Sequence, residues 1–154
     1  MKFSNKTDIQ ASLNATFAGL ADFAAFERQA LRAGADVARL DAQSRPGPGM
    51  IWSVKVEFRG KIQKIVIELV DYLPPEQLSF RIENDGFHAD LRVDLAPLNA
   101  RETRMTVTAD VKPQTLSARL ILQSARLAKG SINRKFGKRL DKFGDDLVNR
   151  IRQS

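Results

Sequence analysis

Hydrophobic and polar residues alternate along most of this chain, and the alternation predicts β-strands. In residues 2–11, Phe3, Thr7 and Ile9 share one side while Lys2 and Lys6 fall on the other. The same period of two recurs over residues 35–42 and through five segments between Met50 and Lys112. Successive side chains of a strand point to opposite faces, so this pattern is typical of strands with one buried face. It predicts seven strands.

A different period, close to 3.6 residues, predicts three helices. Ser12 and Asp22 are suitable N-caps for two short helices, and Gly34 is a suitable residue to end the second one. Residues 114–151 carry apolar side chains at helical spacing and predict one long amphipathic helix. Its apolar stripe consists of Leu116, Leu120, Leu127, Ile132, Phe136, Leu140, Phe143, Leu147 and Ile151.

The order of these elements predicts an α+β fold in a single domain over residues 1–154. Consecutive strands with tight turns, such as the turn at Asn84-Asp85-Gly86, favour an antiparallel sheet. Such a sheet buries its apolar face against another layer, and only the C-terminal helix is long enough to cover it. We therefore expect a curved sheet of about seven strands wrapped on that helix, with two short helices after the first strand.

Composition excludes several kinds of site. The chain has no cysteine, which removes disulfides, thiolate zinc sites and cysteine nucleophiles. A single histidine, His88, excludes a multi-histidine metal site, and alternation places it on the polar face beside Asp90. No cofactor or metal site is expected, and no residue is singled out as catalytic. No stretch has the length of a signal-peptide core or a membrane span, so a cytoplasmic location is expected.

Several segments resemble the SRPBCC (START/Bet v 1-like, polyketide cyclase-like) superfamily, whose members have the helix-grip fold. They are the opening strand with residues 12–23, Gly49-Met50-Ile51-Trp52, residues 74–80, Thr103-Arg104-Met105 and the terminal helix. The resemblance covers the whole chain as a pattern of elements, without a catalytic motif. It implies a cavity between sheet and helix for lipids, polyketides or other hydrophobic molecules. Known members include binding proteins as well as cyclases and aromatases, so the fold alone leaves the function open.

Binding of a small hydrophobic ligand is the function we favour from the sequence. The inward-facing positions carry almost no titratable groups, whereas proton-transfer and nucleophilic catalysis need such groups in place. A cofactor-free cyclase or aromatase remains the enzymatic alternative. The expected lining of the cavity is apolar. It consists of Trp52, Val54, Val56, Phe58, Ile67, Leu69, Phe80, Ile82, Phe87, Leu91, Met105 and Phe136.

The charge distribution adds a third alternative, an interaction module. The net charge of +7 resides in residues 114–154, where ten Lys and Arg oppose three Asp. A group of cations opposite the apolar stripe could attract an anionic membrane weakly or dock on an acidic partner. This group is Arg134, Lys135, Lys138, Arg139 and Lys142. Nucleic acid is disfavoured because exposed aromatic residues are not expected beside these cations.

Glycines recur every seven residues in the same segment, at positions 130, 137 and 144. Each glycine inside a helix costs about 1 kcal/mol relative to alanine, so the repeat needs a reason. Two explanations stay open. The glycines could allow close approach of another element, or Gly130 could mark a kink or break where the apolar pattern changes phase.

Overall fold

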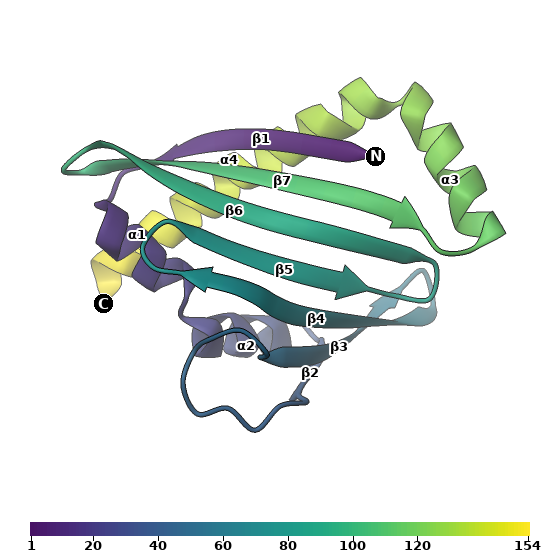
Figure 1. Ribbon diagram of the computed structural model, residues 1–154, viewed down its shortest axis with the longest axis horizontal. Helices are drawn as coiled ribbons and strands as arrows, with labels where there is room; N and C mark the ends of the chain where they lie inside the picture. Colours follow the sequence, from purple (N-terminus) through teal and green to yellow (C-terminus); the bar gives the residue numbers. More distant parts are fainter.

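Seven antiparallel strands form one sheet in this computed structural model, which describes residues 1–154. The strand order is β1-β7-β6-β5-β4-β3-β2, so only β1 leaves its sequence neighbours, to pair with β7 (Figure 1). The strands are β1 (Lys2–Ile9), β2 (Asp36–Arg39), β3 (Ile51–Phe58), β4 (Lys61–Leu73), β5 (Gln77–Glu83), β6 (Phe87–Asn99) and β7 (Glu102–Pro113). The helices are α1 (Leu13–Leu20), α2 (Phe23–Arg32), α3 (Leu116–Leu127) and α4 (Lys129–Gln153).

Local signals in the sequence account for the element boundaries. The side chain of Ser12 accepts a hydrogen bond from the backbone N–H of Ala15, and Asp22 caps α2 in the same way through Ala25. Gly34 follows α2 with a φ of 95°, a conformation that favours glycine. These observations confirm both predicted caps and the predicted end of the second helix.

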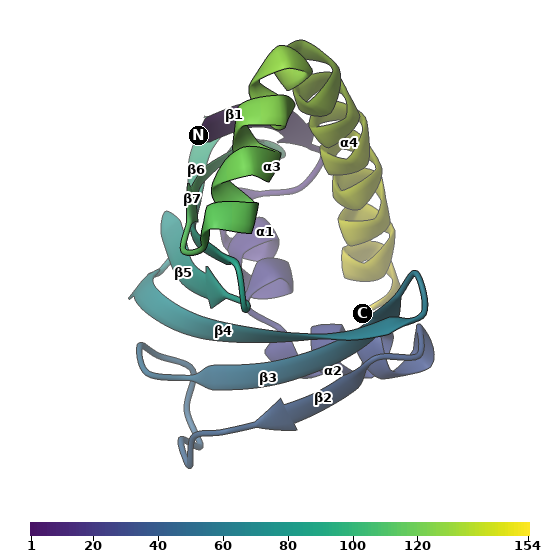
Figure 2. The same cartoon turned by 90° about the vertical axis from the view of Figure 1, so that its right-hand side faces the viewer.

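The sheet is curved, and helices occupy its concave side. Figure 1 shows α4 crossing behind the sheet, and Figure 2 shows the strands curving around from β1, beside α4, to β2, beside α2. The fully buried core is formed where β1, β4 and β7 meet the helices, with Ile9, Leu69 and Met105 at most 1 % exposed. Leu140, Leu147 and Val148 of α4 pack onto this cluster. The predicted α+β architecture, with a curved antiparallel sheet on a C-terminal helix, is confirmed.

The helical segment expected over residues 114–151 is divided, close to Gly130, where the sequence left a kink or break open. The chain forms two helices that meet at Ala128, whose φ of −107° and ψ of 15° end α3, and they form an inverted V in Figure 2. At 100° per residue, Leu116, Leu120 and Leu127 of α3 would point nearly opposite to the apolar residues of α4 on one straight helix. Because of the break, the apolar residues of α4 can pack against the core independently of the direction in which α3 points. Leu116 and Leu127 remain 72 % and 94 % exposed.

The three glycines of α4 have different surroundings. Gly130 lies in the first turn after the break, and a Cβ there would meet nothing closer than Arg134 Nη1 at 3.8 Å. A Cβ at Gly137 would lie 3.1 Å from Asn5 Oδ1, and one at Gly144 would lie 2.9 Å from Ile9 Cδ1. Gly137 and Gly144 therefore allow α4 to approach β1 closely, whereas Gly130 lies next to the break.

Candidate ligand-binding site

An apolar cavity of about 470 Å³ lies between the sheet and helices α2 and α4. Of the 17 residues that line it, 16 are hydrophobic. The cavity exceeds the roughly 300 Å³ at the lower end of small-molecule sites, and a mostly apolar wall is typical of them. The space is large enough for a small hydrophobic molecule.

Six of the twelve residues expected from the sequence lie on the cavity wall. They are Trp52, Val54, Ile67, Phe80, Leu91 and Met105. All six belong to strands β3 to β7, whose alternation turns them toward the concave side. Trp52 is nearly buried, and its ring packs at 5.2 Å between centroids against Phe23 of α2.

The other six expected residues lie outside this cavity. Leu69 is fully buried in the core, and Phe136 packs against the core from α4. Phe58 is 59 % exposed at the tip of the β3–β4 hairpin. The remaining three, Val56, Ile82 and Phe87, are partly buried but do not line the cavity. Alternation identifies which face a residue occupies, but β3, β5 and β6 extend beyond the space that the helices enclose.

Helix α2 supplies lining residues that the sequence interpretation did not include. Phe23, Phe26, Glu27 and Ala30 line the cavity from one face of α2. Their spacing of i, i+3, i+4 and i+7 is that of a single helical face. The signal was therefore present in the sequence, but this helix was expected only as one of two short helices after the first strand, and no residue of it was assigned to the cavity.

The remaining lining residues come from every layer around the cavity. They are Leu20 from α1, Val37 from β2, Leu78 from β5, Val93 from β6, Val107 from β7, and Leu140 and Phe143 from α4. Phe143 stacks on Phe26 with ring centroids 6.0 Å apart, which joins α4 to α2 along one side of the cavity.

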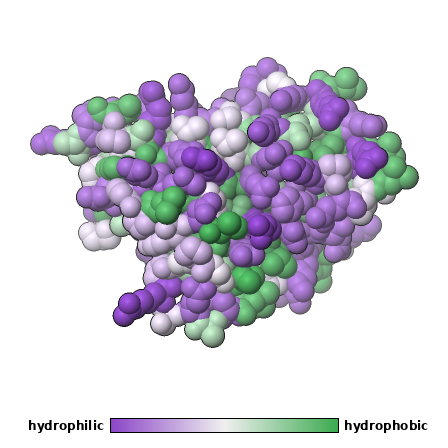
Figure 3. Space-filling model, viewed as in Figure 1, coloured by the Kyte–Doolittle hydropathy of each residue, from purple (hydrophilic) through white to green (hydrophobic).

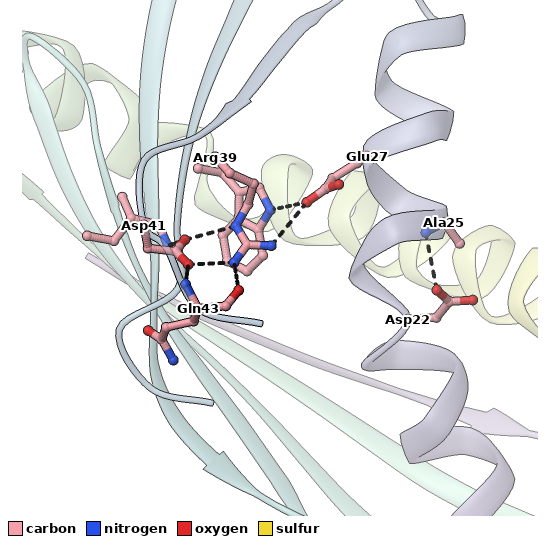
Figure 4. Close-up of polar contacts among 8 residues, drawn as sticks. Asp22, Ala25, Glu27, Arg39, Asp41 and Gln43 are labelled. Atoms are coloured by element: carbon pink, nitrogen blue, oxygen red, sulfur yellow. Dashed lines mark hydrogen bonds and ion pairs between the residues drawn. The ribbon is translucent and has the colours of Figure 1, made fainter. Parts of the chain in front are cut away.

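A polar network adjoins the α2 end of the cavity (Figure 4). Glu27 Oε1 accepts a hydrogen bond of 2.7 Å from Trp52 Nε1 and lies 3.8 Å from Arg39 Nη1. The Arg39 guanidinium donates to the Asp41 carboxylate and lies over the Trp52 ring, 5.5 Å from its centroid. Hydrogen bonds from Arg39 and from the backbone N–H of Ile51 hold the pKa of Asp41 well below its usual range.

Titratable groups elsewhere do not converge on the cavity. His88 lies on the outer face of the sheet, as alternation predicts, with its ring nitrogens 3.0 Å from Glu83 Oε1 and 3.2 Å from Asp90 Oδ1. The hydrogen bond with Glu83 raises the pKa of His88 above its ordinary value. No three His, Cys, Asp or Glu side chains come together in a way that could hold a metal ion. Glu27 is thus the one titratable residue on the cavity wall.

Comparison with known proteins identifies the fold. No family model matches the sequence, and no curated protein matches it. A START superfamily protein from Mycobacterium smegmatis matches in structure with a TM-score of 0.64 and 19 % identity, over 99 % of this chain and 97 % of that one. The Zhui aromatase/cyclase from Streptomyces sp. R1128 matches with a TM-score of 0.67 and 13 % identity, over 99 % and 94 %. The chain has the helix-grip fold.

A third solved structure extends the same likeness. Ara h 8.0201 matches with a TM-score of 0.66 and 10 % identity, over 100 % of this chain and 99 % of that one. The resemblance to the START/Bet v 1-like fold is thereby confirmed along the whole chain. At these identities the property that the proteins share is the fold, and function depends on the residues that line each site.

Proposed function

We propose that this protein binds a small hydrophobic molecule, such as a lipid or an apolar metabolite, in the cavity between the sheet and helices α2 and α4. The observation that carries the proposal is the wall itself, which encloses about 470 Å³ with 16 hydrophobic residues out of 17. Burying apolar ligand surface contributes roughly 25 cal/mol per Å², so such a wall favours apolar occupants over water. A ligand that enters would contact Trp52, the single tryptophan of the chain.

A dye titration with two matched variants tests this proposal. Nile red, a neutral environment-sensitive dye, should bind with saturation and change the fluorescence of Trp52. Ala30→Phe adds a ring inside the cavity and should weaken binding at least tenfold. Ala24→Phe adds the same ring to the exposed side of the same helix and should leave binding unchanged. Native mass spectrometry of the purified protein would then reveal any ligand carried through purification.

Two outcomes of the Nile red titration would contradict the proposal. If Nile red fails to saturate, or if Ala30→Phe and Ala24→Phe bind it alike, the cavity is not the binding site. The enzymatic alternative, a cyclase-like activity, is favoured only by the likeness to an aromatase/cyclase. Glu27 has no second titratable group beside it on the wall to complete an acid–base pair, so the geometry favours binding over catalysis.

A second candidate function, docking on an anionic membrane, is favoured by the solvent-facing side of α3. Leu116, Leu120 and Leu127 are all exposed, while Ala118 on the opposite side of the helix is buried. Figure 3 shows hydrophobic residues at the right-hand end of the molecule, where Figure 1 places α3. Residues 111–140 contain eight Lys and Arg and no acid. Exposed leucines beside cations are typical of helices that lie in a membrane interface.

The cations expected from the sequence lie on the neighbouring helix, α4. Arg134, Lys135, Lys138, Arg139 and Lys142 are all exposed there. Phe136, Leu140, Phe143 and Leu147 pack inward, so the apolar surface offered to lipid comes from α3 and not from α4. None of the helices is long and apolar enough to cross a membrane. Docking would therefore be superficial, with the leucines of α3 inserted and the cations attracting anionic headgroups.

Vesicle sedimentation tests the docking. The protein should bind vesicles of phosphatidylcholine with phosphatidylglycerol better than pure phosphatidylcholine, and added salt should weaken the binding. Changing Leu116, Leu120 and Leu127 to Ser should abolish binding. Changing three exposed leucines elsewhere, Leu31, Leu40 and Leu73, should not. Equal binding by the two triple variants would exclude α3 as the docking surface.

A further inference from the structure

Glu27 is the only polar residue among the 17 that line the apolar cavity. The Glu27 side chain is 26 % exposed, so beside this apolar space its carboxylate loses part of its hydration, which is unfavourable unless other groups compensate for it. Any hydrophobic residue on the same face of α2 would have extended the apolar wall instead. The position of this carboxylate therefore needs an explanation beyond packing.

The contacts of Glu27 within the protein involve only one of its two carboxylate oxygens. Oε1 accepts the hydrogen bond from Trp52 Nε1, and this oxygen is also the one that faces Arg39 Nη1. No side chain or backbone group donates a hydrogen bond to Oε2. A glutamine could accept the bond from the indole equally well through its amide oxygen. The second carboxylate oxygen is left free to accept a hydrogen bond from something else.

Arg39 neutralises Glu27 only in part. The Arg39 guanidinium is engaged by Asp41, to which Nε donates at 2.8 Å, whereas its nearest distance to Glu27 is 3.8 Å. Asp41 is fixed in turn by the backbone N–H groups of Ile51 and Gln43, at 2.7 and 2.9 Å. Figure 4 shows these contacts holding Arg39 beside Glu27. The carboxylate of Glu27 is thus held in place at the cavity wall while much of its charge is left for another partner.

We propose that Glu27 accepts a hydrogen bond from the ligand. Resting on the ligand-binding function proposed above, this assignment names the ligand class: an apolar molecule with a hydroxyl or ammonium group at one end. The apolar body lies against the wall formed by the sheet and α4, and the donor group reaches Glu27 at the α2 end. A ligand that ends in a carboxylate is repelled by Glu27, and a plain hydrocarbon leaves the oxygen without a partner.

Four straight-chain probes related to dodecane, which differ in the group at one end, test the assignment, by displacement of Nile red near pH 7. They are 1-dodecanol, dodecylammonium, 1-methoxydodecane and dodecanoate. A hydrogen bond to a charged acceptor predicts that the alcohol binds about tenfold more tightly than the ether, which cannot donate. The ammonium should bind more tightly than the alcohol because it carries a charge opposite to that of the carboxylate, and dodecanoate should bind most weakly.

Variants of Glu27 separate its charge from its hydrogen bond. Glu27→Gln should keep the preference for alcohol over ether but lose the preference for ammonium over alcohol. Glu27→Leu should lose both preferences while still binding the ether. Glu57→Gln removes a carboxylate from the exposed side of β3 and should behave as the unaltered protein does. If Glu27→Leu does not fold, the affinities of Glu27→Gln for the ammonium and the alcohol still test the role of the charge of Glu27.

A failure of the role assigned to Glu27 can be distinguished from a failure of the proposed ligand binding. If alcohol and ether displace the dye equally in the unaltered protein, or if the preference for alcohol persists in Glu27→Leu, the role of Glu27 is overturned while ligand binding stands. If dodecanoate binds as tightly as the alcohol, the charge of Glu27 does not select ligands. If no probe displaces the dye and the dye itself does not saturate, the proposed binding function fails, and this inference fails with it.

Discussion

Replacing the glycines of α4 by alanine should separate those that touch β1 from the one that does not. At Gly130 the new methyl group enters open space, so only the helix preference for alanine acts. We expect Gly130→Ala to stabilise the protein by about 0.5–1 kcal/mol. At Gly144 the same preference applies, but the methyl group would lie 2.9 Å from Ile9 Cδ1 and 3.4 Å from Thr7 Cγ2.

The crowding at Gly144 should outweigh the helix preference. Ile9 is completely buried, so its side chain cannot move out into solvent to make room. Inserting a methyl group into a packed interior typically costs about 1–3 kcal/mol. After the helix preference of about 1 kcal/mol is subtracted, Gly144→Ala should be destabilising by up to about 2 kcal/mol. The two variants should therefore differ by roughly 1–3 kcal/mol.

Urea unfolding followed by Trp52 fluorescence measures the difference. The midpoints should shift in opposite directions while the slope with denaturant stays the same. Ile9→Val removes the Cδ1 atom that would clash, so Gly144→Ala should cost less in that background than in the unaltered protein. If Gly144→Ala stabilises as much as Gly130→Ala, the close contact between α4 and β1 is refuted.

Three further predictions follow from side chains outside the cavity. Since the partners of His88 raise its pKa, its contribution to stability is complete below about pH 6.5 and lost as the pH rises through the folded value. In thermal melts, the stability of His88→Gln should therefore fall less than that of the unaltered protein between pH 6 and pH 8, about the range in which histidine titrates. The pKa of Asp41 is lowered, so its contribution is complete above about pH 3.9 and is lost on further acidification. Asp41→Asn should accordingly flatten the acid side of the stability profile, and an unchanged profile would contradict the role of Arg39. Phe136→Ala should destabilise the protein by about 2 kcal/mol in urea unfolding, less than a fully buried phenylalanine, because its ring is only partly buried.

The strands were predictable because each has one buried and one exposed face. Alternation depends only on that difference, and tight turns then leave few possible pairings. The position of His88 on the outer face, for example, follows from the alternation of its neighbours alone. Phe58 illustrates the limit of alternation. Its face is the inward one, yet the hairpin carries it beyond the helices, and alternation contains no information on how far a neighbouring layer extends.

The break in the C-terminal helix and the role of Glu27 were harder to predict. Apolar spacing in α3 and in α4 is equally helical, and only the change of phase between Leu127 and Ile132 distinguishes two helices from one. A stripe that faces solvent has the same sequence pattern as one that faces the core. Glu27 appears in sequence as an ordinary charged residue of a surface helix. Its significance depends on Trp52 and Arg39, which lie far along the chain and meet it only in the fold.

The cavity itself follows from how α4 sits against the sheet. On one side, Gly137 and Gly144 let the helix lie almost against β1. On another, Phe143 projects toward α2 and stacks on Phe26, whose ring also lies 4.5 Å from the Arg150 guanidinium. Small residues at one contact and aromatic rings at the other keep the helix close to β1 and away from the middle strands. A change at Gly144 that lifts α4 from β1 should therefore alter ligand affinity as well as stability, although Gly144 does not line the cavity.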